Sequence, residues 1–73
     1  MSGTIHYARG GPEDRRTHWR TTRPTEGDLI THTQAAGPLT RGGYRVKRVI
    51  TFGEGEDRQF GAYAEWEESG QVP

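Results

Sequence analysis

Glycine and proline interrupt the chain so often that no stretch between them favours a helix of normal length. The 73 residues include 11 glycines and 4 prolines, most of them grouped at 10–12, 24–27, 37–38, 42–43 and 53–55. Between these breaks, β-branched and aromatic residues dominate, which favours short strands. We therefore predict an all-β fold. At most one helical turn is expected, at 12–16 (PEDRR), where a proline comes first and acidic residues follow.

Five runs read as strands: 5–8, 18–22, 28–33, 44–52 and 60–66. The last two alternate most clearly, and the loop 53–59 between them predicts a β-hairpin. Five short strands in a chain of this length indicate one small, partly open five-stranded barrel of SH3-, OB- or PUA-like type. The single domain spans residues 1–73, with flexible ends at 1–3 and 69–73.

The expected core follows from alternation along these strands. In 44–52 the alternation has one fault, because Arg48 falls on the apolar face and Val49 on the polar face. A bulge near Arg48, or a strand covered on both faces, would explain it. The predicted core residues are Ile5 or Tyr7, Trp19, Leu29 or Ile30, Tyr44, Val46, Ile50, Phe52, Phe60, Ala62, Ala64 and Trp66.

Composition narrows the function. Leu, Ile, Val and Phe total only 10 of 73 residues, so a homodimer or another partner could supply burial that the core lacks. The chain has no cysteine, which excludes disulfides, thiolate catalysis and cysteine-based zinc sites. With no long apolar run, we expect a cytoplasmic protein without membrane contact. Arginine outnumbers lysine nine to one, as expected for a GC-rich genome such as that of an actinobacterium or its phage.

A formal net charge of zero hides two oppositely charged parts. Residues 1–50 carry nine Lys or Arg against four Asp or Glu (+5), and residues 51–73 carry one against six (−5). The stretch 15–24 (RRTHWRTTRP) mixes arginines with an aromatic ring, the combination that contacts phosphates and stacks on bases. The first functional hypothesis is a basic face that binds RNA or DNA through Arg15, Arg16, His18, Arg20, Arg23, Tyr44, Arg45 and Lys47. The competing interpretation is a charged strand face over a core anchored by Trp19, with paired or solvated arginines of little energetic effect.

The acidic part supports a second hypothesis, nearly equal in weight. A protein–protein adaptor or a small phage-type inhibitor would engage a basic partner, or the basic part of another copy, with its hairpin loop and tail. An exposed sheet edge could add to that contact. The residues expected in this role are Glu54, Glu56, Asp57, Glu65, Glu67 and Glu68.

Little in the sequence favours catalysis. The only serines, Ser2 and Ser69, lie near the ends, and there is no glycine-rich phosphate loop of the required spacing. The histidines, His6, His18 and His32, lack any spacing typical of metal ligands. We therefore expect no enzyme activity, no catalytic residues, no metal and no cofactor.

The segment 26–30 (EGDLI), followed after a glycine-rich gap by 44–49 (YRVKRV), resembles the central part of PUA/ASCH-like small barrels. In those domains a Gly-Asp turn opens a strand, and a later Y-x-V-x-x-V strand crosses the barrel. SH3-like barrels contain similar sequences. The resemblance covers about a third of the chain and implies binding of RNA or modified nucleotides. No binding residue is assigned from it.

Overall fold

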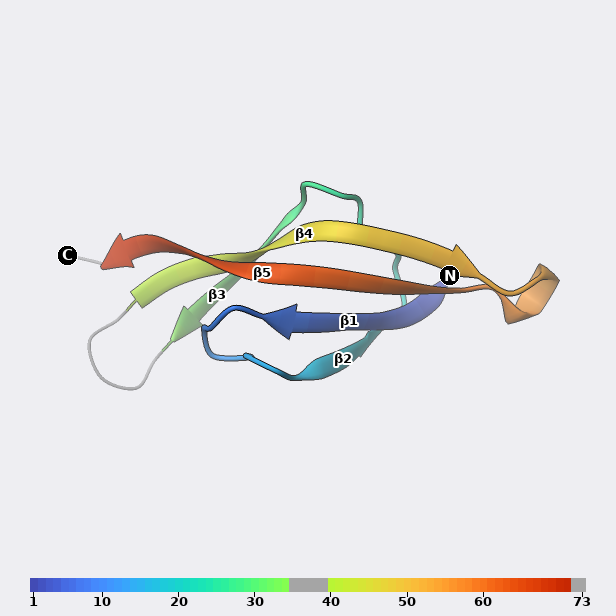
Figure 1. Ribbon diagram of the computed structural model, residues 1–73, viewed down its shortest axis with the longest axis horizontal. Helices are drawn as coiled ribbons and strands as arrows, with labels where there is room; N and C mark the ends of the chain where they lie inside the picture. The colour runs from blue at the N-terminus through green and yellow to red at the C-terminus, as the bar shows by residue number, and fades with distance from the viewer. Residues whose placement is uncertain (35–39, 72–73) are drawn as a thin grey trace.

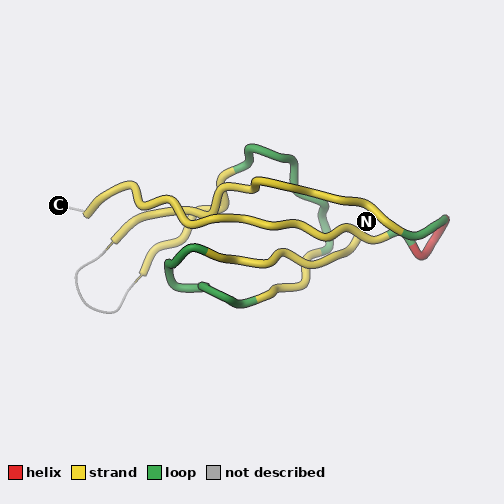
Figure 2. Tube along the Cα trace, in the orientation of Figure 1, coloured by secondary structure: helices red, strands yellow, loops and turns green. Residues whose placement is uncertain are grey.

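Five strands form one sheet in a computed structural model of the chain. The model describes the backbone of residues 1–34 and 40–71 and the side chains of residues 1–30 and 42–68. The strands are β1 (Ser2–Ala8), β2 (Thr17–Arg20), β3 (Leu29–Gln34), β4 (Thr40–Phe52) and β5 (Gln59–Gln71), with one 3₁₀ turn, η1 (Gly55–Asp57). Figure 2 shows that most of the described chain lies in strands, with loops at 9–16, 21–28 and 53–58. The predicted all-β class is confirmed.

No α-helix occurs in the described residues, and none of their helices is long and apolar enough to cross a membrane. The segment expected to form a helical turn, 12–16, forms hydrogen-bonded turns instead. The Asp14 N–H donates to the Gly11 carbonyl at 3.3 Å, and the Arg16 N–H donates to the Glu13 carbonyl at 3.0 Å.

The strand order across the sheet is β2-β1-β5-β4-β3. All neighbouring strands pair antiparallel except β1 and β5, which pair parallel. Figure 1 shows β1, β5 and β4 side by side, with β3 crossing at an angle behind β4 and β5. The sheet is curled, and because the two edge strands β2 and β3 are not paired with each other, it forms a half-barrel rather than a closed barrel. The predicted partly open five-stranded barrel is confirmed in this form.

The predicted hairpin of β4 and β5 is present, and both strands are longer than expected. Each has 13 residues, so the hairpin gives the molecule a long axis of 48 Å against 20 and 17 Å. Its turn requires Gly53, whose φ is +87° and where an added Cβ would lie 2.4 Å from the Asp57 carbonyl oxygen. Strand β1 begins at Ser2 and β5 continues to Gln71, so both strands extend into the terminal segments 1–3 and 69–73 that were expected to be flexible. Residues 72–73 lie outside the described part.

The core lies on the concave side of the curled sheet, here called the inner face. It consists of Ile5, Tyr7, Tyr44, Val46, Phe60, Ala62 and Ala64, with Ile30, Val49 and Trp66 packed against it. The ring of Tyr44 is fully buried, with its centroid 4.6 Å from that of Tyr7 and 5.0 Å from that of Trp66. Aromatic rings thus supply much of the burial that the few aliphatic residues cannot.

A bulge in β4 overturns two of the predicted core positions. Val46 pairs with Ala64 and Arg48 pairs with Tyr63, so Lys47 is an extra residue between them. Beyond this bulge the alternation changes phase: Val49 pairs with buried Ala62. Ile50 and Phe52 therefore face away from the core and are each 51% exposed. The sequence prediction of a bulge near Arg48 is confirmed, and the prediction that Ile50 and Phe52 are buried is wrong.

Strand β2 lies in the opposite orientation to the one predicted. His18 pairs with buried Ile5, and Trp19 pairs with Thr4. Paired residues share a face, so His18 lies on the inner face while Trp19 points outward and is 60% exposed. The prediction of Trp19 as a core anchor is wrong, because β2 is an edge strand with four exposed residues and no layer covers its outer side.

The segment 21–28 lies along the edge of β4 beyond Arg45, where the pairing of β3 with β4 has ended. The Gly27 N–H donates to the Val46 carbonyl, and the Val46 N–H donates to the Asp28 carbonyl, both at 2.8 Å. Further along, the Val49 N–H donates to Glu26 Oε1 at 3.2 Å. The segment therefore satisfies backbone groups of β4 that would otherwise form an open edge.

Candidate binding site

Exposed apolar and aromatic side chains gather on the convex side of the sheet, here called the outer face. Strand pairing places four residues in one row across it: Trp19 of β2, Thr4 of β1, Gly61 of β5 and Ile50 of β4. Phe52 lies beside this row, because an added Cβ at Gly61 would be 3.8 Å from Phe52 Cε1. Large side chains at both ends and small residues in the middle give the row a hollow profile.

A second row runs parallel to the first and consists of Thr17, His6, Tyr63 and Arg48. The His6 and Tyr63 rings are stacked, with centroids 6.2 Å apart and planes inclined by 15°. His6 Nδ1 lies 3.1 Å from Thr17 Oγ1, and the Tyr63 hydroxyl donates to Glu65 Oε2 at 3.1 Å. These contacts restrict the orientation of both rings on the exposed face.

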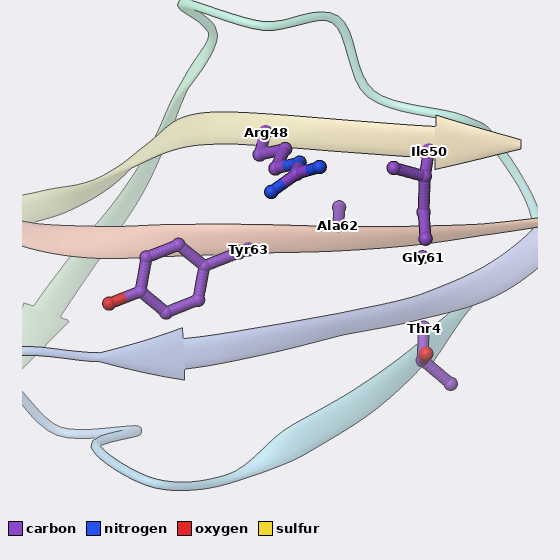
Figure 3. A pocket seen from close by; sticks show the side chains of 6 residues that line it. All are labelled: Thr4, Arg48, Ile50, Gly61, Ala62 and Tyr63. Atoms are coloured by element: carbon purple, nitrogen blue, oxygen red, sulfur yellow. The ribbon is translucent and has the colours of Figure 1, made fainter.

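The two rows enclose a shallow depression, the outer-face groove, of about 400 Å³. Its lining residues are Thr4, Arg48, Ile50, Gly61, Ala62 and Tyr63. Figure 3 shows Arg48 and Ile50 extending from β4 toward β5, and the Tyr63 ring extending from β5 toward β1. The Arg48 side chain makes no hydrogen bond or ion pair with any other described residue. The groove therefore combines small residues and Ile50 with one aromatic ring, that of Tyr63, and one guanidinium group available to a ligand.

The basic residues predicted to form a nucleic-acid-binding face are dispersed. Arg15 and Arg16 lie in the connection between β1 and β2, and Arg16 Nη1 is 3.7 Å from Glu13 Oε2. Near the other edge, Arg45 donates to Glu67 Oε1 at 3.1 Å, and Lys47 Nζ is 3.9 Å from Glu67 Oε2. Strand pairing thus interleaves basic with acidic side chains, which leaves no basic patch built from all the predicted residues.

The contact between Arg45 and Glu67 is the most extensive ion pair among the described residues. The Arg45 guanidinium also donates to the Gly27 carbonyl at 2.7 Å. Hydrogen bonding to Arg45 holds the pKa of the Glu67 carboxyl below its usual value, and the same bonds raise the pKa of Arg45. Arg45 is therefore occupied in joining β4, β5 and the segment 21–28.

Two of the predicted binding residues lie on the inner side. Tyr44 is fully buried, and its hydroxyl donates to the Gly10 carbonyl and accepts from the Glu13 N–H, both at 2.8 Å. The alternation in β4 places the Tyr44 ring inward, as its predicted place in the core requires, and the ring is therefore not exposed for stacking on a nucleobase. His18 Nε2 lies 2.8 Å from Glu13 Oε2, and its ring packs edge-on against Tyr7.

The structure brings together the remaining two predicted arginines, Arg20 and Arg23. They lie in a second hollow, the seam cleft, between the unpaired edges of β2 and β3. It is lined by Arg20, Thr22, Arg23, Pro24, Asp28, Leu29 and Ile30. Arg23 Nε donates to Thr51 Oγ1 at 3.2 Å, which fixes one side of its guanidinium. Asp28 Oδ2 accepts from the Thr25 N–H at 3.0 Å, so the one carboxylate of the cleft is already hydrogen-bonded.

The acidic residues of the second hypothesis separate into two groups. Glu54, Glu56 and Asp57 are exposed at the tip of the hairpin, in and beside η1. In the body of β5, Glu65 contacts Arg9 at 3.5 Å and Glu67 contacts Arg45, while Glu68 is exposed. Only the tip therefore presents several carboxylates close together without ion pairs to other described residues.

Among the described side chains, no group of three or more His, Asp or Glu is placed to hold a metal ion. His6 and His18 lie on opposite faces of the sheet, and the side chain of His32 is outside the description. No family model, curated protein or solved structure matches the chain. The resemblance to PUA/ASCH-like barrels rests on the residues quoted for it.

Sequence reasoning missed the residues that form the outer face. Ile50, Phe52 and Trp19 were assigned to the core, and Tyr63 was not among the predicted binding residues. One signal was available: Arg48 stands where an uninterrupted alternation requires an apolar residue. Shifting the phase at that point turns Ile50 and Phe52 outward together with Arg48.

Proposed function

We propose that the protein is a non-catalytic module that binds single-stranded nucleic acid on its outer face. The observation that carries the proposal is the exposure of Trp19 and Phe52, together with half-buried Tyr63 beside Arg48, on one sheet surface. Proteins that bind single strands stack bases on aromatic side chains and hold the backbone with cationic groups. A double helix hides its base faces, so a surface of this kind favours unpaired strands.

The local charge supports the same ligand class. Neither row of the outer face contains an acidic residue, although the chain has ten. Arg48 is exposed and is not neutralised by any described carboxylate. A phosphate beside Arg48 would therefore meet an unpaired guanidinium, whereas the Tyr63 end of the groove is bordered by Glu65, whose Oε2 accepts from the Tyr63 hydroxyl.

The test is fluorescence anisotropy of labelled single-stranded RNA, single-stranded DNA and duplex DNA at two salt concentrations. Each stacked base contributes about 1–3 kcal/mol, so Trp19→Ala is expected to weaken single-strand binding roughly 5- to 150-fold. Trp19→Phe, which keeps a ring at the same place, is expected to retain most of the affinity. Equal binding by wild type and Trp19→Ala, or a preference for duplex, would count against the proposal.

A specific observation favours one other function. The carboxylates of Glu54, Glu56 and Asp57 lie at one end of a 48 Å molecule, and they suit a basic protein partner or a basic region of a second copy. Self-association through this tip would weaken with salt. Sedimentation velocity over a range of protein and salt concentrations tests it: a monomer under every condition would eliminate contact between copies.

A further inference from the structure

The outer face and the seam cleft meet at the same edge of the sheet. Trp19 and Arg20 are neighbours in β2, and their side chains point to opposite sides of it. Trp19 ends the first row of the outer face, while Arg20 lines the seam cleft. The edge strand therefore carries an aromatic ring on one side and a guanidinium on the other, one residue apart.

No described strand pairs with the free edge of β2. All four β2 residues are exposed. A ligand chain lying across the outer face can consequently bend around β2 without crossing another element. The position of β1, which occupies the other edge of β2, restricts this passage to the side where the seam cleft opens.

The seam cleft is equipped for an anion. Arg20 has no hydrogen bond or ion pair with another described residue, and the terminal nitrogens of Arg23 have none either. The bond from Arg23 Nε to Thr51 holds that guanidinium in place, so its free N–H groups are oriented in advance. Two arginines against the single carboxylate of Asp28 leave a formal local excess of one positive charge.

We infer that a bound strand crosses the sheet from Ile50 to Trp19, bends over the β2 edge and places its next phosphates on Arg20 and Arg23. This inference rests on the proposed function and adds the path of the ligand. Three strand spacings separate Ile50 from Trp19, which is about 14 Å. At about 3.4 Å per stacked nucleotide, the outer face accommodates roughly four nucleotides. Contacts in the seam cleft then require a longer strand.

The experiment measures binding of oligothymidylates of 4, 8 and 12 nucleotides at low salt. Wild-type affinity is expected to rise between the shortest and the longest probe. The double variant Arg20→Ala/Arg23→Ala is expected to bind the shortest probe within twofold of wild type and the longest at least fivefold more weakly. Arg58→Ala is the control for loss of a positive charge outside the proposed path: it removes one charge from the hairpin and is expected to change the affinity for neither probe.

The single variant Arg20→Ala is a control for misfolding of the double variant. Arg23 is bonded to Thr51, whereas the Arg20 side chain makes no bond to another described residue, so the single variant is expected to keep the wild-type circular dichroism spectrum. Wild-type affinity of the double variant for every probe, or an equal loss for all three lengths, would overturn the path and leave the proposed function standing. Absence of wild-type binding to any probe would overturn the proposed function itself, and the path inferred here with it.

Discussion

The hydroxyl of Tyr44 connects the core to the segment between β1 and β2. It donates to the Gly10 carbonyl and accepts from the Glu13 N–H, on a side chain that is fully buried. Tyr44→Phe removes both hydrogen bonds and is expected to lower the free energy of unfolding by roughly 1–3 kcal/mol. Urea denaturation measures the change. Tyr63→Phe, whose hydroxyl lies at the surface, is the control and is expected to change stability by less than about 1 kcal/mol.

Because of the same hydroxyl, the free energy of unfolding is expected to depend on pH in the alkaline range. Burial raises the pKa of Tyr44, so the folded protein holds this proton more tightly than the unfolded chain does. Its contribution to stability is fully present below the unfolded pKa of about 10 and is lost as pH rises through the folded pKa. The stability difference between wild type and Tyr44→Phe is therefore expected to narrow above about pH 10. A difference that stays constant over this range would contradict the assignment.

Strand β4 shows what one extra residue does to an element. Its alternation is correct up to Val46, fails at the Lys47 bulge and resumes with the other phase. The sequence indicated that a bulge was needed near Arg48, because that arginine interrupts an apolar face. It did not decide between a bulge and a strand covered on both faces, and Ile50 and Phe52, which are as apolar as core residues, were therefore assigned to the core. The orientation of a short edge strand such as β2 is equally hard to predict, because its four residues contain no alternation that indicates which side faces the core.

Because of the bulge, substitutions at two apolar positions of β4 are expected to lower the free energy of unfolding by different amounts. Val46→Ala removes buried methyl groups and is expected to lower the free energy of unfolding by roughly 1.5–3 kcal/mol. Ile50→Thr, on the outer side of the same strand, is expected to lower it by less than about 1 kcal/mol. Thermal and urea unfolding of both variants compare the two effects. A larger loss for Ile50→Thr would return Ile50 to the core and remove the outer face.

Strand β5 offers a way to fill the groove without disturbing the fold. A Cβ added at Gly61 would be 3.6 Å from Ile50 Cγ1 and 3.8 Å from Phe52 Cε1, both ordinary contact distances. Valine is also favoured in strands. Gly61→Val is therefore expected to keep or raise the melting temperature while weakening single-strand binding at least tenfold. Wild-type affinity in a folded Gly61→Val protein would mean that the ligand does not occupy the groove.

The whole molecule combines elements that local patterns predict with contacts that they do not. Alternation and turn residues predicted the β class, the number of strands and the hairpin of β4 and β5. The parallel pairing of β1 with β5 joins the two ends of the chain, and no local pattern encodes which distant strands will be neighbours. The same pairing decides the electrostatics, because it places Glu65 beside Arg9, just as the pairing of β4 with β5 places Glu67 beside Arg45.

The ion pairs of Arg9 with Glu65 and of Arg45 with Glu67 limit how strongly nucleic-acid binding should depend on salt concentration. A chain with ten Lys and Arg would show a steep slope if all of them met phosphates, whereas the outer face and the seam cleft together offer three: Arg48, Arg20 and Arg23. Single strands give a slope of log K against log salt of about −0.7 per phosphate neutralised, so the expected slope is about −2. Anisotropy titrations of a 12-nucleotide strand at several salt concentrations measure it. Arg48→Ala is expected to reduce the slope by about 0.7, and Trp19→Ala is expected to weaken binding without changing it. A wild-type slope near −5 would instead mean that the ion pairs of Glu13, Glu65 and Glu67 open to release their arginines to the ligand.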